Sequence, residues 1–347
     1  MGDPTALGTP HSKPGTRLRQ GYGGQARHTA LSTTLFTQHR AAGTSAARPL
    51  LKWAGGKRQL LPALRAFYPE SFGRYFEPFV GSGAVFFDLY ASGRLAGARA
   101  TLTDCNADLI GCYRMVRDRT VEVQRALARL ARGHETGAAD HFYAVRERFN
   151  RARARLAGVD VIDSYTPALA AMLIYLNRTG FNGLFRLNAA GHFNVPVGRY
   201  VRPRICDPAH LAAVAAALGT PGVSLDLAPF ESAVGAARAG DLVYFDPPYA
   251  PVSGTARFTS YTARPFTLED HIRLRDCAIA LARRGCAVMV SNSSAPAMSA
   301  LYEEDRRTAA AGLRVFRIPA RRAINSRGSS RGPVTEFLLT NLTPRNP

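Results

Sequence analysis

The feature that most constrains the fold is a short apolar run, Leu242 to Phe245, followed directly by Asp246-Pro247-Pro248-Tyr249. The run is rich in β-forming residues and bounded by turn residues, so we expect a buried strand. Such a strand delivers a carboxylate to its carboxyl end, which is where open α/β sheets bind ligands. The two prolines also remove two N–H donors, so the carbonyls there face the cleft with no donor beside them.

These four residues suit one kind of ligand, a planar ring that carries an exocyclic amino group. The Asp246 carboxylate and the Pro247 carbonyl only accept hydrogen bonds, and the Tyr249 ring offers a stacking face. On these residues alone, a strand that merely stops at an Asp-Pro-Pro turn is an equally good interpretation. The choice between the two depends on the rest of the chain.

Composition narrows the class of partner. The chain has 347 residues, enough for one large domain or two, and 45 Lys and Arg against 25 Asp and Glu give a net charge of +20. This balance favours a polyanionic partner such as nucleic acid, although solvated arginines alone would produce it too. No apolar run approaches the ~18 residues of a membrane span. The five cysteines lack the close pairs of a zinc site or the framework of a secreted scaffold, so we expect no metal and a cytoplasmic setting.

The chain divides into four parts by composition. Residues 1–47 are rich in Gly, Thr, Ser and Arg with a single acid, Asp3, and are predicted to be a disordered basic tail. Residues 48–109 and 207–347 alternate strand and helix patterns, which predicts an α/β sheet. Residues 110–206 are Arg- and Ala-rich and have a mainly helical pattern. We interpret them as an insert between the two α/β parts.

A glycine turn follows the first expected strand, Tyr75 to Val80. Gly81-Ser82-Gly83 permits a tight turn into a helix and a close approach of the backbone to a ligand, but the third glycine of the dinucleotide fingerprint is missing. This favours a nucleoside ligand over a nicotinamide dinucleotide. Asp104 ends a second strand 21 residues after Gly83, near the ~20-residue spacing at which an acid reaches ribose hydroxyls. The alternative is that Asp104 caps the helix beginning near Ala107, and we favour ribose binding.

The segment Gly55-Gly56-Lys57 does not complete a Walker loop, because the earlier glycine is missing and Arg58 replaces the Ser or Thr. We interpret it as a tight turn near a ligand, with Trp53 either as a stacking wall or as a core residue.

A polar and aromatic segment, residues 177–200, lies in the insert. Asn182-Gly183 and Ala190-Gly191 are turn signals between short β-like runs, so a hairpin is expected. Its amides, arginines and aromatics suit contacts with base edges and phosphates, whereas the alternative is an ordinary surface hairpin. The long polar loop 251–266, next to the carboxylate, is expected to act as a lid or binding element.

These segments, in this order, closely resemble the Dam-type DNA adenine-N6 methyltransferases from about Leu50 to about Leu342. The match is carried by Leu51 to Lys57, Phe76 to Gly83, Thr103 to Ile110, Leu176 to Tyr200, Asp246 to Pro251 and Ser291-Asn292. A single motif could arise by chance, but the ordered set is specific.

The resemblance implies a Rossmann-like sheet that binds S-adenosylmethionine, with an inserted, mainly helical target-recognition domain carrying the hairpin. It implies methyl transfer to N6 of a flipped adenine in double-stranded DNA, with Asp246, Pro247 and Tyr249 as catalytic residues. The cofactor residues it implies are Trp53, Lys57, Phe79, Gly81, Gly83, Asp104 and Asp246. The DNA residues it implies, matched to a GATC site, are Lys52, Asn182, Leu184, Arg186, Pro196 and Arg199.

The same resemblance implies a cytoplasmic, nucleoid-associated enzyme, monomeric in solution, either solitary or paired with a cognate restriction endonuclease. Residues 105–108 and Ser293-Ser294 depart modestly from the family's commonest forms, and nothing before Arg48 has a counterpart.

Other classes fit less well. A cytosine-C5 methyltransferase typically takes its thiolate from a Pro-Cys pair, and no cysteine here follows a proline. A glutamine or RNA-amine methyltransferase more typically begins its four-residue motif with Asn. A nicotinamide oxidoreductase fits the sheet but neither the glycine pattern nor the charge. A non-catalytic DNA-binding factor with a relic cofactor fold is disfavoured by Asp246 and the intact glycine turn.

Overall fold

The computed structural model describes residues 1, 46–53, 55–156, 160–250, 266–321 and 333–345. The predicted tail, residues 1–47, and the predicted lid, residues 251–266, lie almost entirely outside the described residues. The described helices and strands belong to the compact unit that begins at Gly43.

A seven-stranded sheet forms the centre of this unit, with the strand order β3-β2-β1-β4-β5-β7-β6. Neighbours from β3 to β5 pair in parallel, and β7 is antiparallel to both β5 and β6. The predicted Rossmann-like α/β sheet is therefore confirmed. The strands are β1 (Arg74–Glu77), β2 (Arg99–Asp104), β3 (Val223–Leu227), β4 (Leu242–Phe245), β5 (Ala287–Ser293), β6 (Arg314–Arg321) and β7 (Pro333–Thr340).

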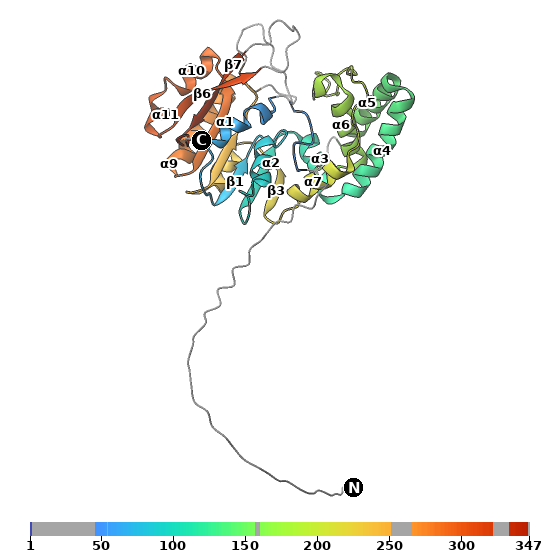
Figure 1. Ribbon diagram of the computed structural model, residues 1–347, viewed down its shortest axis with the longest axis horizontal. Coiled ribbons are helices and arrows are strands. Elements are labelled where there is room, and N and C mark those ends of the chain that lie inside the picture. The colour runs from blue at the N-terminus through green and yellow to red at the C-terminus, as the bar shows by residue number, and fades with distance from the viewer. Residues whose placement is uncertain (2–45, 54, 157–159, 251–265, 322–332, 346–347) are drawn as a thin grey trace, which may run out of the picture. The chain divides into compact units, whose positions relative to one another are not determined.

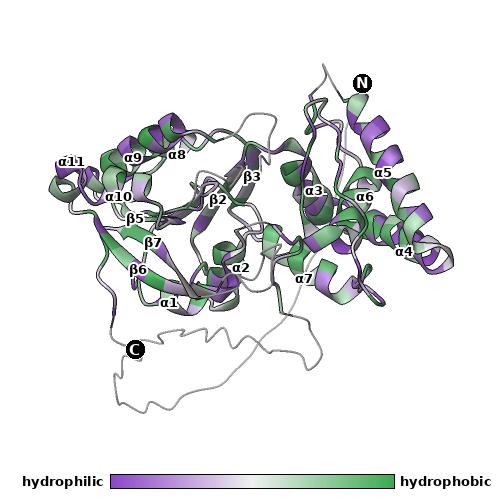
Figure 2. Ribbon diagram, turned by 90° about the horizontal axis from the view of Figure 1, so that it is seen from above, coloured by the Kyte–Doolittle hydropathy of each residue, from purple (hydrophilic) through white to green (hydrophobic). Residues whose placement is uncertain are grey.

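Helices cover both faces of the sheet, which gives three layers (Figure 2). One face packs against α1 (Leu61–Arg65), α2 (Ala84–Ala91) and α3 (Ala107–Asp118). The other packs against α8 (Ser232–Ala236), α9 (Leu268–Arg283) and α10 (Pro296–Tyr302), with α11 (Arg306–Ala310) against α9. Leu242 and Tyr244 of β4 join the first core and Val243 and Phe245 the second, which is why this strand is apolar throughout.

The insert forms a separate group of helices beside the sheet (Figure 1). It contains α4 (Thr120–Thr136), α5 (Ala138–Ala154) and α6 (Pro167–Thr179), and α7 (Pro208–Leu218) leads back to β3. The buried α6 packs against α3, α4 and α5. The proposed boundary between residues 109 and 110 lies inside α3, which also contacts β2 and β3.

The recognition segment differs in detail from the expected hairpin. Asn182-Gly183 forms a one-turn 3-10 helix, η2 (Phe181–Gly183), rather than a hairpin turn, with φ of 53° and 66° at these two residues. The chain reverses at the second expected turn, Ala190-Gly191, where the Gly191 amide donates to the Asn188 carbonyl at 2.9 Å. Isolated bridges, Gly180 to Val197 and Leu187 to Phe193, replace continuous strands.

Candidate active site

The parallel strands β1 and β4 lie side by side at the point where the strand order reverses. From β1 the chain passes to β2 on one side, while β4 lies on the other. The loops that leave the carboxyl ends of such a pair diverge and open a crevice. The glycine turn after β1 and the Asp246 segment after β4 therefore meet at one edge of the sheet.

Asp246 is held by Lys57, which comes from η1 (Lys57–Gln59) near the start of the described unit. The Lys57 Nζ lies 2.6 Å from Asp246 Oδ1, donates to the Gly55 carbonyl and sits 4.3 Å from the centre of the Tyr249 ring. The Tyr249 hydroxyl donates to Glu336 Oε2 of β7 at 2.7 Å. The structure thus brings together Lys57, predicted on the cofactor side, and two of the predicted catalytic residues.

The electrostatics of Asp246 reflect two opposed effects. Burial raises the pKa of this carboxyl to about 6, while the charge of Lys57 and its hydrogen bond work in the opposite direction. The nearby Glu336 charge adds a smaller increase to the same pKa. Asp246 is therefore mainly an ionised acceptor at neutral pH.

The glycine turn is shaped by close contacts that leave no room for side chains. Gly81 has φ of 45°, and a Cβ built there would lie 2.9 Å from Cδ1 of Trp53. Gly83, with φ of 67°, precedes α2 and would place a Cβ 3.2 Å from the Phe87 ring. The Tyr113 hydroxyl donates to the Gly81 carbonyl at 2.8 Å and fixes the turn from α3. Trp53 therefore lies against the turn, next to where a ligand would approach.

Asp104 ends β2 beside this turn. Its Oδ2 accepts from the Gly81 amide at 3.2 Å and its Oδ1 from the Asn106 amide at 2.9 Å. The cap of α3 is Asn106, whose side chain accepts from the Leu109 amide. The helix-cap alternative for Asp104 is therefore wrong. Burial raises the pKa of Asp104 to about 6, against hydrogen bonds from the backbone of Asn106, Gly81 and Cys105 that favour its charge.

A buried carboxyl that the sequence analysis did not single out, Glu77, lies behind the turn. It is 2% exposed, and its Oε2 accepts from the Tyr75 hydroxyl at 2.8 Å and from the Phe86 amide at 3.1 Å. Burial, with a contribution from the Asp246 charge, raises the pKa of Glu77 to about 8. Its position inside β1 could have been flagged as an acid in an otherwise buried strand.

Asn292 of β5 supports the backbone that follows Tyr249. Its Oδ1 accepts from the amides of Ala250 (3.4 Å) and Ser293 (2.8 Å), and Nδ2 lies 3.3 Å from Nδ1 of His271. The Ser293 hydroxyl donates to the Ala250 carbonyl at 2.7 Å. Asn292 and Ser293 therefore anchor the backbone at Ala250, directly after the Asp246 segment.

Phe79, expected on the cofactor side, lies in an aromatic group above the end of β1. Its ring stacks on Phe230 with a centroid distance of 5.4 Å and meets Phe266 edge-on at 5.7 Å. These rings form an apolar wall between β1, α8 and the start of α9.

The predicted DNA residues gather around η2 and the hairpin. Gly183 abuts Lys52, and the Phe181 amide donates to the Pro196 carbonyl at 2.9 Å. Arg186 donates through Nε to Asn194 Oδ1 at 2.8 Å and through Nη2 to the Asn194 carbonyl at 3.3 Å. Leu184 is half-buried, and the exposed members of the group are Lys52, Asn182, Arg186, Pro196 and Arg199. An exposed aromatic that the sequence analysis missed, Phe181, lies among them.

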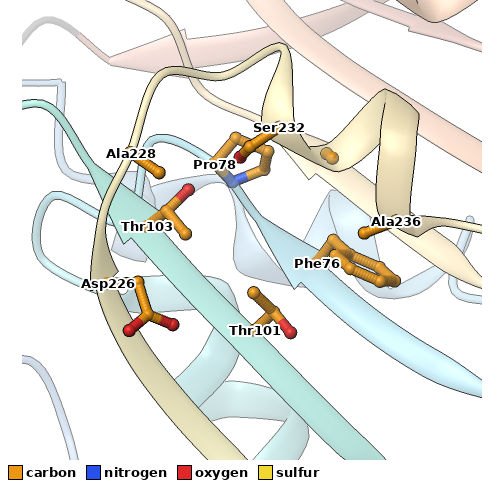
Figure 3. Close-up of a pocket in the computed structure, with 9 residues that line it drawn as sticks. Phe76, Pro78, Thr101, Thr103, Asp226, Ala228, Ser232 and Ala236 are labelled. Atoms are coloured by element: carbon orange, nitrogen blue, oxygen red, sulfur yellow. The ribbon is translucent and has the colours of Figure 1, made fainter.

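A separate pocket of about 180 Å³ lies on the face of β1, β2 and β3 that α8 partly covers (Figure 3). Neither Asp246 nor the glycine turn lines it. Its walls are Phe76, Pro78, Thr101, Thr103, Asp226, Ala228, Ser232, Ala233 and Ala236.

Among the described residues, no three His, Cys, Asp or Glu side chains are grouped so as to hold a metal ion. None of the helices within the same ranges is both long and apolar enough to cross a membrane.

Comparison with known proteins gives a consistent result. The family model of the D12 class N6 adenine-specific DNA methyltransferases matches residues 53–317. The type II methyltransferase M1.LlaDCHI of Lactococcus lactis subsp. cremoris is 38% identical over 294 residues, covering 85% of this chain and 95% of that protein. The DNA adenine methylase of Escherichia coli strain K12 is 36% identical over 293 residues, covering 84% and 94%. The type II methyltransferase M.MjaIII of Methanocaldococcus jannaschii is 35% identical over 305 residues, covering 85% and 99%.

The raised pKa of Glu77 predicts a pH-dependent stability. The folded protein holds this proton up to about pH 8, whereas the ordinary pKa is 4.5. The stabilising contribution is therefore complete below pH 4.5 and is lost as the pH rises toward 8. Glu77→Gln keeps an acceptor for Tyr75 and Phe86 but cannot ionise.

We expect Glu77→Gln to lose less unfolding free energy between pH 5 and pH 8 than the parent, by on the order of 3 kcal/mol. Urea denaturation at several pH values measures the difference. Parallel curves for the two proteins would contradict the buried, proton-holding role of Glu77.

Proposed function

The chain belongs to the D12 class N6 adenine-specific DNA methyltransferases, and from that premise we propose that it methylates the adenine of GATC sites in duplex DNA after flipping that base out of the helix. Membership of the family makes it an enzyme that uses S-adenosylmethionine as methyl donor. The observation that carries the proposal is the placement of Asp246 and Pro247 at the crevice between β1 and β4, with Lys57 on one carboxylate oxygen.

The proposed mechanism addresses the poor nucleophilicity of an adenine amino group, whose lone pair is delocalised into the ring. Asp246 Oδ2 and the Pro247 carbonyl would accept its two hydrogens and draw the nitrogen toward tetrahedral geometry. The lone pair is then aimed for an in-line transfer, which is a matter of positioning and electrostatics. Asp246 need not be a strong base, because the amine becomes acidic once it is methylated.

Base flipping is needed because a methyl donor has no suitable access to adenine N6 inside the duplex. The lone pair of an adenine N6 cannot be aimed at a methyl donor inside a stacked duplex, so the base must leave the helix. Tyr249 would stack on the flipped base, and its hydroxyl bond to Glu336 supports this by fixing the ring plane. Lys57 lies over the same ring and reaches Asp246, so the stacking and the acceptor groups belong to one assembly.

The site residues fit the cofactor. When bound, S-adenosylmethionine supplies its methyl group as an electrophile on a sulfonium centre. The turn at Gly81 and Gly83 would present its backbone to the methionine end, and Asp104 would accept from the ribose hydroxyls. Trp53, against Gly81, and Phe79 would bound the site with aromatic faces. The Asp246 carboxylate also offers a negative charge to a cationic ligand.

The GATC assignment rests on the recognition segment. An arginine fork pairs bidentately with guanine O6 and N7, and each outer base pair of GATC presents one guanine. The two bonds from Arg186 to Asn194 orient the guanidinium and leave further N–H donors for a base. Lys52, across η2, would reach the other guanine, with Asn182, Leu184, Pro196 and Arg199 completing the contact surface.

We also propose that the enzyme acts as a monomer in the cytoplasm, on the DNA of the nucleoid, with or without a cognate restriction endonuclease. Sequencing of methylated bases after expression in a methylation-deficient host tests the site assignment. Modified adenine in GATC is the expected result, and another motif would refute that assignment.

Asp246→Ala should lower the rate of label transfer from S-adenosylmethionine to DNA by a factor on the order of at least 100, because the acceptor that aligns the amino group is gone. DNA affinity should fall much less, since phosphate contacts supply most of it. The matched control is Asp226→Ala, which removes an acid, paired with Arg114, from the end of β3. Circular dichroism checks the fold. Near-normal turnover in Asp246→Ala would contradict the proposed role of Asp246 as the acceptor for the adenine amino group.

Asp104→Ala should weaken cofactor binding, measured by calorimetry, by on the order of 1–3 kcal/mol, because a ribose hydroxyl loses its acceptor. Asn106→Ala is the control, since it removes the cap of α3 next door without touching the proposed ribose acceptor. Equal affinities in Asp104→Ala and the parent would leave Asp104 a purely structural partner of Gly81 and Asn106.

Arg186→Ala should reduce the free energy that favours the correct base pair at one outer position by about 1–3 kcal/mol, and so relax specificity there. The comparison is Arg151→Ala on the exposed surface of α5, where any effect on binding should be uniform across sequences. The measurement is the methylation rate on duplexes with each outer base pair replaced in turn. Unchanged discrimination in Arg186→Ala would remove this residue from the reading surface.

A further inference from the structure

We propose that Asn177 is a positioning residue that holds the DNA-reading segment and the cofactor-side loop in one arrangement, so that sequence discrimination and cofactor affinity depend on the same side chain. The inference rests on the proposed function, in which η2 and the hairpin read DNA.

The first observation is a complete amide clamp inside the protein. Asn177 lies in the last turns of α6 and is 1% exposed. Its Nδ2 donates to the carbonyls of Lys52 at 2.7 Å and Gly183 at 2.8 Å, and its Oδ1 accepts from the Lys52 amide at 2.8 Å. One side chain therefore satisfies backbone groups of two segments that are far apart in the sequence.

The second observation is that these two segments touch without a side chain between them at Gly183. This residue has φ of 66°, and a Cβ built on it would lie 2.5 Å from Cδ and 2.7 Å from Cβ of Lys52. Both the backbone conformation and the space require glycine here. With the Asn177 clamp, this contact fixes η2 against the loop that contains Lys52.

The third observation connects the clamp to the cofactor side. Trp53 follows Lys52 directly, and its indole stacks on Phe185 of the hairpin with centroids 5.4 Å apart and an interplanar angle of 25°. The edge of the same indole lies against Gly81, which in turn donates to Asp104. A continuous set of contacts therefore runs from the reading segment to the glycine turn.

The physical consequence is shared pre-organisation. Removing the amide leaves two carbonyls and one amide of the interior without partners, which loosens both segments. DNA and cofactor must then each order the segment that they bind, and that ordering free energy is subtracted from binding. A residue that touches neither ligand thus affects both.

Asn150 of α5 provides a matched control. Its Nδ2 donates to the Phe193 carbonyl at 3.0 Å, and its Oδ1 accepts from the Phe193 amide at 2.8 Å. It is the same type of clamp on the same hairpin, but it holds the backbone of Phe193 and makes no bond to Lys52 or Gly183. Asn150→Ala should therefore disturb DNA reading and leave the cofactor side intact.

The test measures two quantities in the full-length protein and its variants. One is the Kd of S-adenosylhomocysteine without DNA, by calorimetry. The other is the discrimination ratio, which is the Kd for a duplex with one outer base pair changed divided by the Kd for a duplex carrying the motif that the enzyme methylates. Asn177→Ala should raise the first and lower the second, each about tenfold. Asn150→Ala should change only the second.

An effect of Asn177→Ala on one quantity alone, or an equal effect of Asn150→Ala on both, would overturn the proposal. If Asn177→Ala fails to fold by circular dichroism, Asn177→Asp keeps an acceptor for the Lys52 amide, loses the donors to the Lys52 and Gly183 carbonyls, and must show the same paired loss. The duplexes carry whichever motif the wild-type enzyme methylates. A motif other than GATC therefore refutes the site assignment without affecting this comparison.

Discussion

Parallel pairing of β1 with β4 is the constraint on which the rest of the site depends. The register places Tyr75 opposite Leu242 and Phe76 opposite Val243, so the two strands end at the same edge. A slip of one residue would move Asp246 by about 3.3 Å and turn its side chain to the other face. The 2.6 Å contact with Lys57 would not survive that change. Register, more than any single side chain, therefore sets the geometry of the crevice.

Three acids lie at this edge of the sheet, and burial disfavours the charged form of each. Burial raises the pKa of Glu77 to about 8 and those of Asp104 and Asp246 to about 6. The offsetting partners differ in kind, because Asp104 accepts from backbone amides, Glu77 accepts mainly from the Tyr75 hydroxyl, and Asp246 faces a cation. Acids whose pKa values are shifted together in a crevice are typical of functional sites. The proposed roles follow the partners, since of the three only Asp246 has its charge compensated by a cationic side chain.

The local part of this arrangement was predictable from the sequence, and the long-range part was not. The strand Leu242–Phe245 has the expected bounds because an apolar β-forming run ends there at turn residues. The pairing of Tyr249 with Glu336 and the Asn177 clamp join residues of distant segments, and no periodic pattern encodes them. The hairpin turn expected at Asn182-Gly183 was wrong for a related reason. Its left-handed backbone is a turn signal, but packing against Lys52 decides that the turn is η2.

Lys57 shows how such a long-range contact determines chemistry. With a pKa of about 6, roughly nine-tenths of Asp246 carboxyls are ionised at pH 7, and an ionised carboxyl only accepts hydrogen bonds. Burial without the cation would favour the protonated form, which presents an O–H donor to the ligand instead. The ion pair therefore sets whether Asp246 accepts from an amino group or donates to it. The proposed methylation of adenine requires the first, so Lys57 matters to the acceptor as well as to the Gly55-Gly56 turn whose carbonyl it binds.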